Sequence, residues 1–245
     1  MKQKILVASP TYNRHRHLIE DYVAQFLGFS FQRKHLLLVE AGVEDNDLYY
    51  KELKSKLASE HSITVLKSTH SPSAIERLAY ARNIIRQFAS NYNFTHILFL
   101  DTVTFIPKDS IERLLSHEKD LAGFICMIRT KSGVPKICAL KSGELLMVLN
   151  SEGNNNVKAL DFVDANEILK QRPNLVKIYA TAMSPLLVSR KVFESTPFRY
   201  IPSHPMGEDV AFHIENNQKG FEYFLDTMVT ADHLQIGWED VVKYA

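Results

Sequence analysis

The stretch LFLDTVTFIP, residues 98–107, decides the fold of this chain. Together with His96 and Ile97 it begins as an apolar run without alternation, which is typical of a strand buried on both faces of a parallel sheet. Asp101 follows where that strand leaves the sheet. Ligands of open α/β sheets bind at this carboxyl edge. Asp101 is therefore a candidate binding residue, although an aspartate in this position can also simply cap the next turn.

Strand and helix patterns alternate through the first half of the chain. Ser73 and Glu76 form an S-x-x-E capping box, and apolar residues then recur at three- and four-residue steps as far as Phe88. Strands are expected at 4–8, 36–39, 62–66 and 96–100, and helices at 15–27, 48–59 and from Ser73 onward. This alternation predicts right-handed crossovers and a Rossmann-like half.

The second half has a less regular pattern. A helix from Glu208 is expected to end before Gly220, because glycine often follows a helix C-terminus. The other expected elements are antiparallel strands at 121–128 and 136–149, a turn at 150–156, a helix at 164–171, one or two strands within 175–189 and a strand at 221–225. The predicted fold class is α/β, with a mixed, mostly parallel sheet flanked by helices and a small antiparallel part in the second half.

Composition excludes several classes of protein. The 245 residues are 45% hydrophobic and 23% charged, as in globular proteins generally. Because 29 basic and 28 acidic residues leave a net charge of +1, we expect no nucleic-acid partner. The apolar runs are too short for a transmembrane segment, and MKQKILVASP suits a first strand better than a signal peptide. We therefore expect a cytoplasmic protein, and the sequence leaves its oligomeric state open.

Two cysteines, Cys126 and Cys138, lie on either side of the turn signal KSGVP (131–135). They are placed to face each other across a hairpin. Two cysteines are too few for a secreted disulfide scaffold, and cytosolic thiols mostly stay reduced. Reduced thiols are therefore favoured over a disulfide.

Other polar residues are expected at the same sheet edge as Asp101. The loop SPTYNR (9–14) follows the first strand, and Glu40 ends the second. Proline, threonine and asparagine also make ordinary turns, so this loop is weak as a signal. Glu40 suits either a contact with a base or ribose or a solvated position in a loop.

Two further signals lie near the end of the chain. Glu208 and Asp209 are adjacent acids at the start of a helix, where the macrodipole favours acids whatever their function. His233 is expected in a loop after the last strand. A lone histidine is more often a surface or core residue than a metal ligand.

The order of these signals resembles that of the family 2-like glycosyltransferases of the GT-A fold. The matching stretches are SPTYNR (9–14), AYARNIIRQFA (79–89), HILFLDTVTFIPKDSIERLL (96–115), GEDVAFHIENNQKGFEYFLD (207–226) and His233. The resemblance covers most of the chain but is weak over residues 120–205. It implies one GT-A-like domain over 1–245, with a nucleotide-binding half at 1–119 and an acceptor-side half at 120–245.

The resemblance also implies roles for particular residues. Asp209, paired with Glu208, is the expected general base of an inverting transfer, and His233 is an expected metal ligand with Asp101. In that family a loop like SPTYNR and an acid like Glu40 hold the base and ribose. Guanidinium groups match phosphate oxygens, which adds arginines near this edge. The expected nucleotide-binding residues are Pro10, Thr11, Tyr12, Asn13, Arg14, Glu40, Arg77, Arg82 and Asp101.

Val103 departs from the pattern of that family. There, a second aspartate two positions after the first usually contacts a divalent cation directly, and valine supplies no lone pair. The hydroxyls of Thr102 and Thr104 are poor substitutes toward a hard cation. Binding of Mn²⁺ or Mg²⁺ is therefore expected to be weak or to depend on the nucleotide.

Two functions of different classes fit these residues. The first is an inverting, hexosyltransferase-type enzyme that transfers a sugar from a nucleoside-diphosphate sugar to a hydroxyl of an unknown carbohydrate, protein or lipid acceptor. The second is a non-catalytic nucleotide-binding or assembly protein that retains the fold with a degenerate metal site. The acid pair favours the enzyme, and Val103 favours the alternative. A nucleotidyltransferase is disfavoured because no glycine-rich, lysine-bearing loop follows the first strand.

Overall fold

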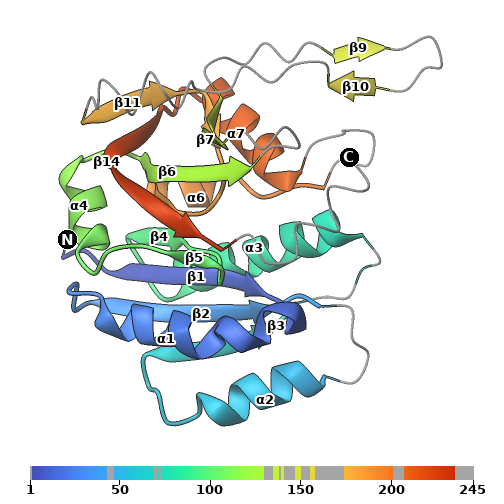
Figure 1. The fold of residues 1–245 in the computed structure, drawn as a ribbon, viewed down its shortest axis with the longest axis vertical. Coiled ribbons are helices and arrows are strands. Elements are labelled where there is room, and N and C mark those ends of the chain that lie inside the picture. The colour runs from blue at the N-terminus through green and yellow to red at the C-terminus, as the bar shows by residue number, and fades with distance from the viewer. Residues whose placement is uncertain are drawn as a thin grey trace.

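The computed structural model describes residues 2–42, 47–68, 71, 73–129, 135–137, 139–140, 147–149, 155–157, 174–200 and 207–234. Its main sheet has the strand order β11-β14-β6-β13-β4-β1-β2-β3, with β5 paired to β14 and β7 paired to β6 (Figure 1). Strands from both halves of the chain therefore share one sheet.

The first half supplies the parallel part of this sheet. Strand β1 lies between β2 and β4, and β3 pairs with the far side of β2, all in parallel. Every residue of β1 is buried, as expected for a strand covered on both faces. The four strands expected here are confirmed, with small shifts at their ends. Their bounds are β1 (Ile5–Thr11), β2 (Lys34–Glu40), β3 (Ile63–Lys67) and β4 (His96–Phe99).

The second half extends the sheet mainly with antiparallel pairs. Strand β13 runs antiparallel to both β4 and β6, and β11 runs antiparallel to β14, whereas β14 and β6 are parallel. The expected mixed sheet is therefore present. The longer strands are β6 (Leu121–Arg129), β11 (Leu175–Ile178), β13 (Leu186–Ser189) and β14 (Tyr223–His233). The shorter ones are β5 (Thr104–Phe105), β7 (Pro135–Ile137), β8 (Ala139–Leu140), β9 (Met147–Leu149), β10 (Asn155–Val157) and β12 (Ala180–Thr181).

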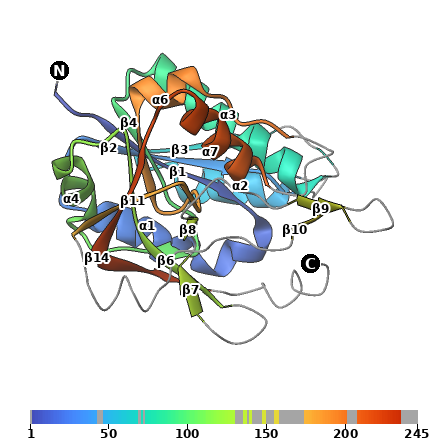
Figure 2. The ribbon, with the colours of Figure 1, turned by 90° about the horizontal axis from the view of Figure 1, so that it is seen from above.

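Helices cover both faces of the sheet and enclose two cores. Figure 2 shows α3, α6 and α7 together on one side and α1 on the other. Alternate residues of β1 face opposite cores: Ile5 and Val7 pack with α1, and Leu6 and Ala8 pack with α3. In the described part of the chain, no helix is both long enough and apolar enough to cross a bilayer. The helices are α1 (Ile19–Gly28), α2 (Leu48–Lys56), α3 (Ala74–Asn91), α4 (Ser110–Ser116), α6 (Arg190–Ser195) and α7 (Glu208–Gln218).

Helix α3 begins as its sequence predicts. Ser73 Oγ accepts a hydrogen bond from the Glu76 backbone N–H at 3.3 Å, which satisfies one of the free donors of the first turn. The Glu76 carboxylate does not complete the capping box, because it accepts hydrogen bonds from the hydroxyls of Ser71 and Tyr80 instead. Half of the expected box is thus present, and it fixes the start of the helix that carries Arg77 and Arg82.

Two expectations near the ends of the chain are corrected. Residues 13–18 form a 3-10 helix, η1 (Asn13–Leu18), and the α-helix begins only at Ile19. The polar run NRHRH has no apolar stripe to hold an α-helical turn against the sheet, and Leu18 is the buried residue of η1. His233 does not lie in a loop after the last strand: β14 continues to this residue, because its end pairs with β5.

A β-bulge lies in the middle of β14, where its register with β6 shifts between Asp226 and Thr230. The Asp226 carboxylate is buried there. It accepts two hydrogen bonds from Arg113 on α4, at 2.5 and 2.9 Å, one from His117 at 2.7 Å and one from the Met228 backbone N–H at 2.9 Å. This Asp226 clamp ties the bulge to α4.

Smaller differences occur elsewhere. Helix α2 ends at Lys56, and residues 175–189 contain three strands where one or two were expected. Strands β9 and β10 pair antiparallel, and β10 begins at Asn155, so the end of the turn expected at 150–156 is a strand; residues 150–154 lie outside the described residues. The expected helix at 164–171 and Cys138 lie outside the described residues, so both remain predictions.

Candidate active site

Three polar segments lie at one end of the parallel strands. Thr11, at the end of β1, is in register with Glu40, at the end of β2. Asp101 follows β4, and its backbone N–H donates to Ser184 Oγ at 2.8 Å. The loop after β1, Glu40 and Asp101 thus share one edge of the sheet, which is the edge where α/β proteins bind ligands.

The loop after β1 presents a tyrosine and an arginine. Pro10 and Thr11 are buried, and Thr11 Oγ1 lies 3.1 Å from the Tyr49 hydroxyl oxygen. Tyr12 precedes η1, and the exposed Arg14 guanidinium carbon lies 5.6 Å from the centroid of its ring. Asn13 begins η1 and is partly buried. Tyr12 and Arg14 are therefore the side chains of this loop best placed to meet a ligand.

Glu40 and Arg77 are both engaged by backbone groups. Glu40 Oε1 accepts from the Gly42 N–H at 2.6 Å. Arg77 is buried and donates to the carbonyls of Ala41 at 3.1 Å and Ser71 at 2.5 Å. Arg77 thus holds the loop after β2 against the start of α3. Binding of ribose by Glu40 and of phosphate by Arg77 remain predictions.

A buried ion pair joins α3 to α7. Arg82 Nη1 donates to Glu208 Oε1, and these side chains are only 7% and 4% exposed. The Arg82 guanidinium carbon lies 5.6 Å from the Phe198 ring centroid. Its Nε is buried and has no hydrogen-bond acceptor among the residues described. An unpaired buried N–H is costly, so this donor marks a position for a ligand or for another part of the chain.

The neighbouring residue, Asn83, holds the segment that Arg82 packs on. Its Nδ2 donates to the Phe198 carbonyl at 2.7 Å, and its Oδ1 accepts from the Phe198 N–H at 3.0 Å. The Phe198 ring in turn stacks on Phe212 of α7, with centroids 4.3 Å apart. Arg82 and Asn83 therefore have a clear structural role: they fix α7 and the segment before it.

Several carboxylates surround Arg82. Burial opposes the charge on Arg82, but Glu208, Asp101 and Asp209 together raise its pKa. Burial also raises the pKa of Asp101, although Arg82 partly offsets this. The pKa of Glu208 is raised for the same reason, again against the effect of Arg82. One permanent cation thus faces three acids in a region of low polarity.

Tyr12 lies in the same electrostatic environment. Burial raises the pKa of its phenol above the ordinary value, and Asp101 and Glu208 raise it further, whereas Arg82 and Arg77 lower it. The phenol therefore stays protonated and is a hydrogen-bond donor at neutral pH.

Asp209 is more accessible than its neighbour Glu208. It is partly exposed, whereas Glu208 is buried. Its Oδ1 accepts from the Val210 N–H at 2.8 Å, and its Oδ2 has no hydrogen bond within the described part of the chain. A Cβ on Gly207 would lie 2.7 Å from Oδ1, so a larger residue there would require the Asp209 carboxylate to shift.

His213 is a residue that the sequence analysis missed. It lies on α7 four residues after Asp209, is fully buried and packs edge-on against Tyr223, with ring centroids 4.6 Å apart. Burial lowers its pKa to about 4, so the imidazole is neutral at physiological pH. The four-residue spacing from an acid at a helix start was the available signal.

His15 belongs to the polar run NRHRH (13–17), which gives it no distinguishing signal in the sequence. Its Nδ1 lies 3.2 Å from Thr102 Oγ1, in the turn after Asp101. Burial, together with the neighbouring Arg14, His17 and His233, lowers its pKa to about 4. A neutral imidazole therefore lies between η1 and the end of β14.

The residues available for a divalent cation are few. Val103 is 5% exposed, and its carbonyl accepts from the Leu234 N–H at 2.9 Å. Asp101 and His233 are the two expected ligands. In the described part of the chain, no three His, Cys, Asp or Glu side chains are arranged to hold a metal ion. Because Mg²⁺ and Mn²⁺ prefer six mostly oxygen ligands, these residues alone do not fit a resident divalent cation.

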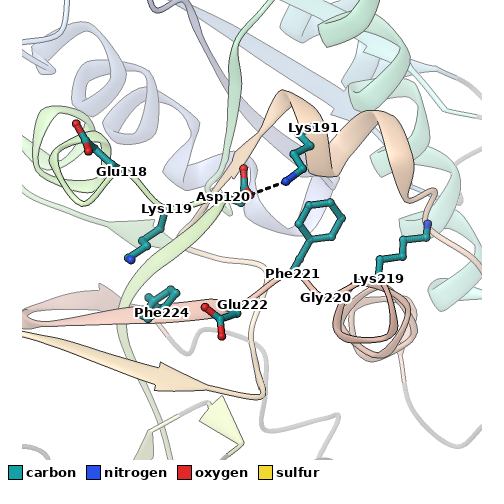
Figure 3. Close-up of a pocket in the computed structure, with 9 residues that line it drawn as sticks. All are labelled: Glu118, Lys119, Asp120, Lys191, Lys219, Gly220, Phe221, Glu222 and Phe224. Carbon is teal, nitrogen blue, oxygen red and sulfur yellow. Dashed lines mark ion pairs between the residues drawn. The ribbon is translucent and has the colours of Figure 1, made fainter.

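A separate hollow of about 240 Å³ lies at the opposite end of α7 (Figure 3). Three lysines and three acids line it, so its charges balance. Lys191 lies 3.6 Å from Asp120, and the Lys119 ammonium lies 4.6 Å from the Phe224 ring centroid. None of the candidate residues described above lines this hollow.

Comparisons with known proteins identify the fold. No sequence-family model matches the chain, and no curated protein matches it either. Among solved structures, S. aureus TarS (1–349) with UDP-GlcNAc aligns over 93% of this chain with a TM-score of 0.54 and 15% identity. GalNAc-T7 with UDP, GalNAc and Mn²⁺ aligns over 94%, with a TM-score of 0.64 and 12% identity. The chain has the GT-A fold.

The likeness concerns part of longer proteins. This chain spans 58% of the TarS chain with UDP-GlcNAc and 44% of the GalNAc-T7 chain. Within the GT-A fold, Asp101 follows a central parallel strand, and Glu208 and Asp209 begin the helix before β14. The fold brings together four residues that are distant in the sequence: Tyr12, Arg82, Asp101 and Glu208.

Proposed function

We propose that this chain is an inverting, family 2-like glycosyltransferase, which transfers a sugar from a nucleoside-diphosphate sugar to an acceptor hydroxyl. One observation carries the proposal. At the carboxyl edge of a GT-A sheet, a partly exposed carboxylate, Asp209, begins a helix next to a buried arginine–glutamate pair. This arrangement supplies a base for the acceptor and a fixed positive charge close to it.

Asp209 is the proposed general base. The acceptor hydroxyl loses its proton to Oδ2 as its oxygen forms a bond to the sugar C1. The bond from C1 to the diphosphate oxygen breaks on the opposite face of the sugar, and inversion follows from this in-line geometry. Glu208 is a less suitable base, because Arg82 holds its carboxylate in the interior. We assign Glu208 the role of positioning Arg82 and the start of α7.

The nucleotide is proposed to lie across the ends of β1, β2 and β4. Asp101 would accept hydrogen bonds from the ribose, and Tyr12 with Arg14 would contact the base or the diphosphate. The charge around Arg82 affects this binding: Glu208, Asp101 and Asp209 all act on Arg82, and carboxylates so close disfavour a bare diphosphate beside them. A divalent cation that arrives with the nucleotide would offset this charge, and phosphate oxygens would complete its coordination. We therefore propose that cation binding depends on the nucleotide.

A donor panel tests the function. Purified protein is incubated with UDP-, GDP- and TDP-sugars, with and without Mn²⁺, and release of the nucleoside diphosphate is measured. Turnover that depends on an added acceptor and disappears in Asp209→Asn supports the transferase. NMR of the product gives the anomeric configuration, and retention would contradict the in-line mechanism.

A second function keeps one specific observation in its favour. Val103 and the small number of possible metal ligands among the described residues suit a protein that binds nucleotides without catalysis, or that serves in an assembly. Such a protein would gain thermal stability from a nucleotide sugar, by about 2.7 kcal/mol at a hundred times the dissociation constant. It would show no turnover with any donor, and Asp209→Asn would leave its properties unchanged.

A further inference from the structure

A groove of about 580 Å³ lies at the end of the parallel strands opposite to Asp101. One wall is the face of the sheet at β2 and β3, and the other is the C-terminal end of α3 with the turn that follows. Its lining includes Lys4, Arg33, Leu66, Phe88 and Tyr92. This groove is distinct from the candidate active site, because every residue of that site lies at the other end of the strands.

Aromatic rings give the groove an apolar surface. Phe88 contacts His35, Tyr92 and Phe94, with ring centroids 5.9, 4.5 and 6.1 Å apart. Phe94 is buried, whereas Tyr92 is 58% exposed. The rings are held by one another and by the end of α3, so the surface exists before any partner binds.

Basic residues line the groove. Its lining contains Lys4, Arg33 and Lys34 and no acid, in contrast to the balanced hollow of Figure 3. The Lys4 ammonium lies 4.2 Å from the Phe94 ring centroid and donates to the Tyr92 carbonyl at 2.9 Å, which leaves two of its three donors. Lys34 donates to the Phe29 carbonyl at 2.6 Å, and Arg33 is exposed.

The groove borders β3, the outermost described strand of the sheet, which packs against α2 through Ile63 and Val65. β3 is the last strand in the sheet order of the described residues, so one side of its backbone has no neighbouring strand there. Edge strands of this kind accept an added strand. Thr64 and Leu66 of β3 face the groove. A strand added beside β3 would place every second side chain on the same face.

We propose that this groove binds an extended, acidic segment of a partner polypeptide, which adds as a strand beside β3. Its apolar side chains pack toward Phe88 and Leu66, and its carboxylates lie near Lys4 and Arg33. A second copy of this chain is a poor occupant, because its own β3 edge carries the same positive charge. A lipid surface is also a poor occupant, because the aromatic rings line a concavity.

A peptide-binding experiment tests the proposal without any sugar nucleotide, so its outcome does not depend on the proposed enzyme. The probe is a fluorescein-labelled nonapeptide, EIEYEIEYE, titrated with the whole chain and followed by fluorescence anisotropy. A version with lysine in place of each glutamate tests whether binding requires negative charge on the peptide. A version N-methylated at alternate residues lacks backbone N–H donors and tests whether the peptide pairs as a strand. Both are expected to bind at least about tenfold more weakly than the probe.

Variants of the chain provide the second comparison. Arg33→Glu, and Lys4→Glu with Arg33→Glu, are expected to weaken binding of the acidic peptide by about tenfold or more. Lys119→Glu with Lys191→Glu makes the same change of charge in the hollow of Figure 3 and should bind as the parent does. Arg33 is exposed, so its variant remains informative if the double variant does not fold.

Four outcomes would overturn the proposal. No binding of the acidic peptide at about 1 mM protein excludes a useful affinity. Equal binding of the N-methylated peptide excludes strand addition. The chain could instead bind vesicles of phosphatidylcholine and phosphatidylserine and not the peptide. If Arg33→Glu abolishes that vesicle binding, the groove is assigned to a lipid surface. If the chain dimerises at high concentration and Arg33→Glu prevents this, the groove is assigned to a second copy of the chain.

Discussion

Arg82 and Glu208 form the buried ion pair that fixes α3 against the first turn of α7. The pair lies directly behind Asp209, so the position of the candidate base depends on an interaction between residues 126 positions apart. A buried pair of this kind is costly to break from one side, because the remaining charge has lost its partner. Arg82 and Glu208 are therefore tied to stability as well as to the proposed function.

Glu208→Ala is expected to lower the free energy of unfolding by about 3 kcal/mol, because it leaves the buried Arg82 charge without its nearest carboxylate. Glu215→Ala on the same helix is the matched control. Glu215 pairs with Lys219 at the surface, and its loss should cost about 1 kcal/mol or less. Urea unfolding followed by circular dichroism measures both, and equal losses would contradict a special role for the buried pair.

Asp209→Asn is expected to reduce transfer by about 10²–10⁴-fold, because the variant lacks a general base. Nucleotide affinity should not fall, since Asp209 bonds to its own helix and not to the loop after β1. Glu215→Gln makes the same chemical change farther along α7 and serves as the control. Steady-state rates with the active donor test this, and a parental rate for Asp209→Asn would make Asp209 only a helix cap.

Asp101→Ala is expected to weaken nucleotide binding even in EDTA. A lost hydrogen bond to a charged group is worth about 1.5–3 kcal/mol, or roughly ten- to a hundredfold in affinity. Calorimetric titration of the parent and the variant with the preferred nucleoside diphosphate gives the difference. Asp109→Ala, near the start of α4, is the control. Unchanged affinity for Asp101→Ala would remove this residue from the ribose site.

Val103→Asp is expected to tighten Mn²⁺ binding by about tenfold, and mainly when the nucleotide is present. The aspartate would add a ligand to Asp101 and His233, and the diphosphate would add more. Val103→Asn is the control for placing a polar side chain in a buried position. Titrations of Mn²⁺ with and without the nucleoside diphosphate measure the effect. Tight binding by the nucleotide-free parent would mean that a ligand is missing from our description.

The Asp226 clamp predicts a dependence of stability on pH. Burial raises the pKa of Asp226, but hydrogen bonds from Arg113, His117 and Met228 outweigh this and leave the pKa below its ordinary value. The clamp therefore stabilises the fold above the unfolded pKa of about 3.9, and this contribution is lost as the pH falls through the folded value.

We expect Asp226→Asn to be destabilised most near neutral pH, and its deficit in unfolding free energy should shrink as the pH falls below about 4. Urea unfolding of the parent and the variant across this range measures the deficit. A constant difference would mean that ionisation of Asp226 does not contribute.

Local patterns were enough to predict the parallel half of the fold. The run before Asp101 indicated a buried strand, and the Ser73 cap with its apolar stripe indicated α3. Both signals depend on neighbouring residues alone. The resemblance to the GT-A fold supplied what these patterns lack, namely the expected grouping of Asp101, Asp209 and His233.

Long-range pairing accounts for what the sequence analysis missed. β14 seemed to end at Leu225 because polar residues follow, but a bulge and pairing with β5 carry it on to His233. The Arg82–Glu208 pair joins two helices that have no local relation. His213 has no distinguishing pattern in the sequence beyond its spacing from Asp209.

The bulge in β14 makes the candidate site sensitive to insertions and deletions in this strand. Side chains of a strand alternate between faces, so the number of residues between Asp226 and Thr230 sets which of Asp232 and His233 turns toward Asp101. Deleting one residue there would exchange the two, and a carboxylate would take the place of an imidazole beside the candidate nucleotide site. Insertions and deletions in this short segment therefore change the chemistry of the site without altering any residue within it.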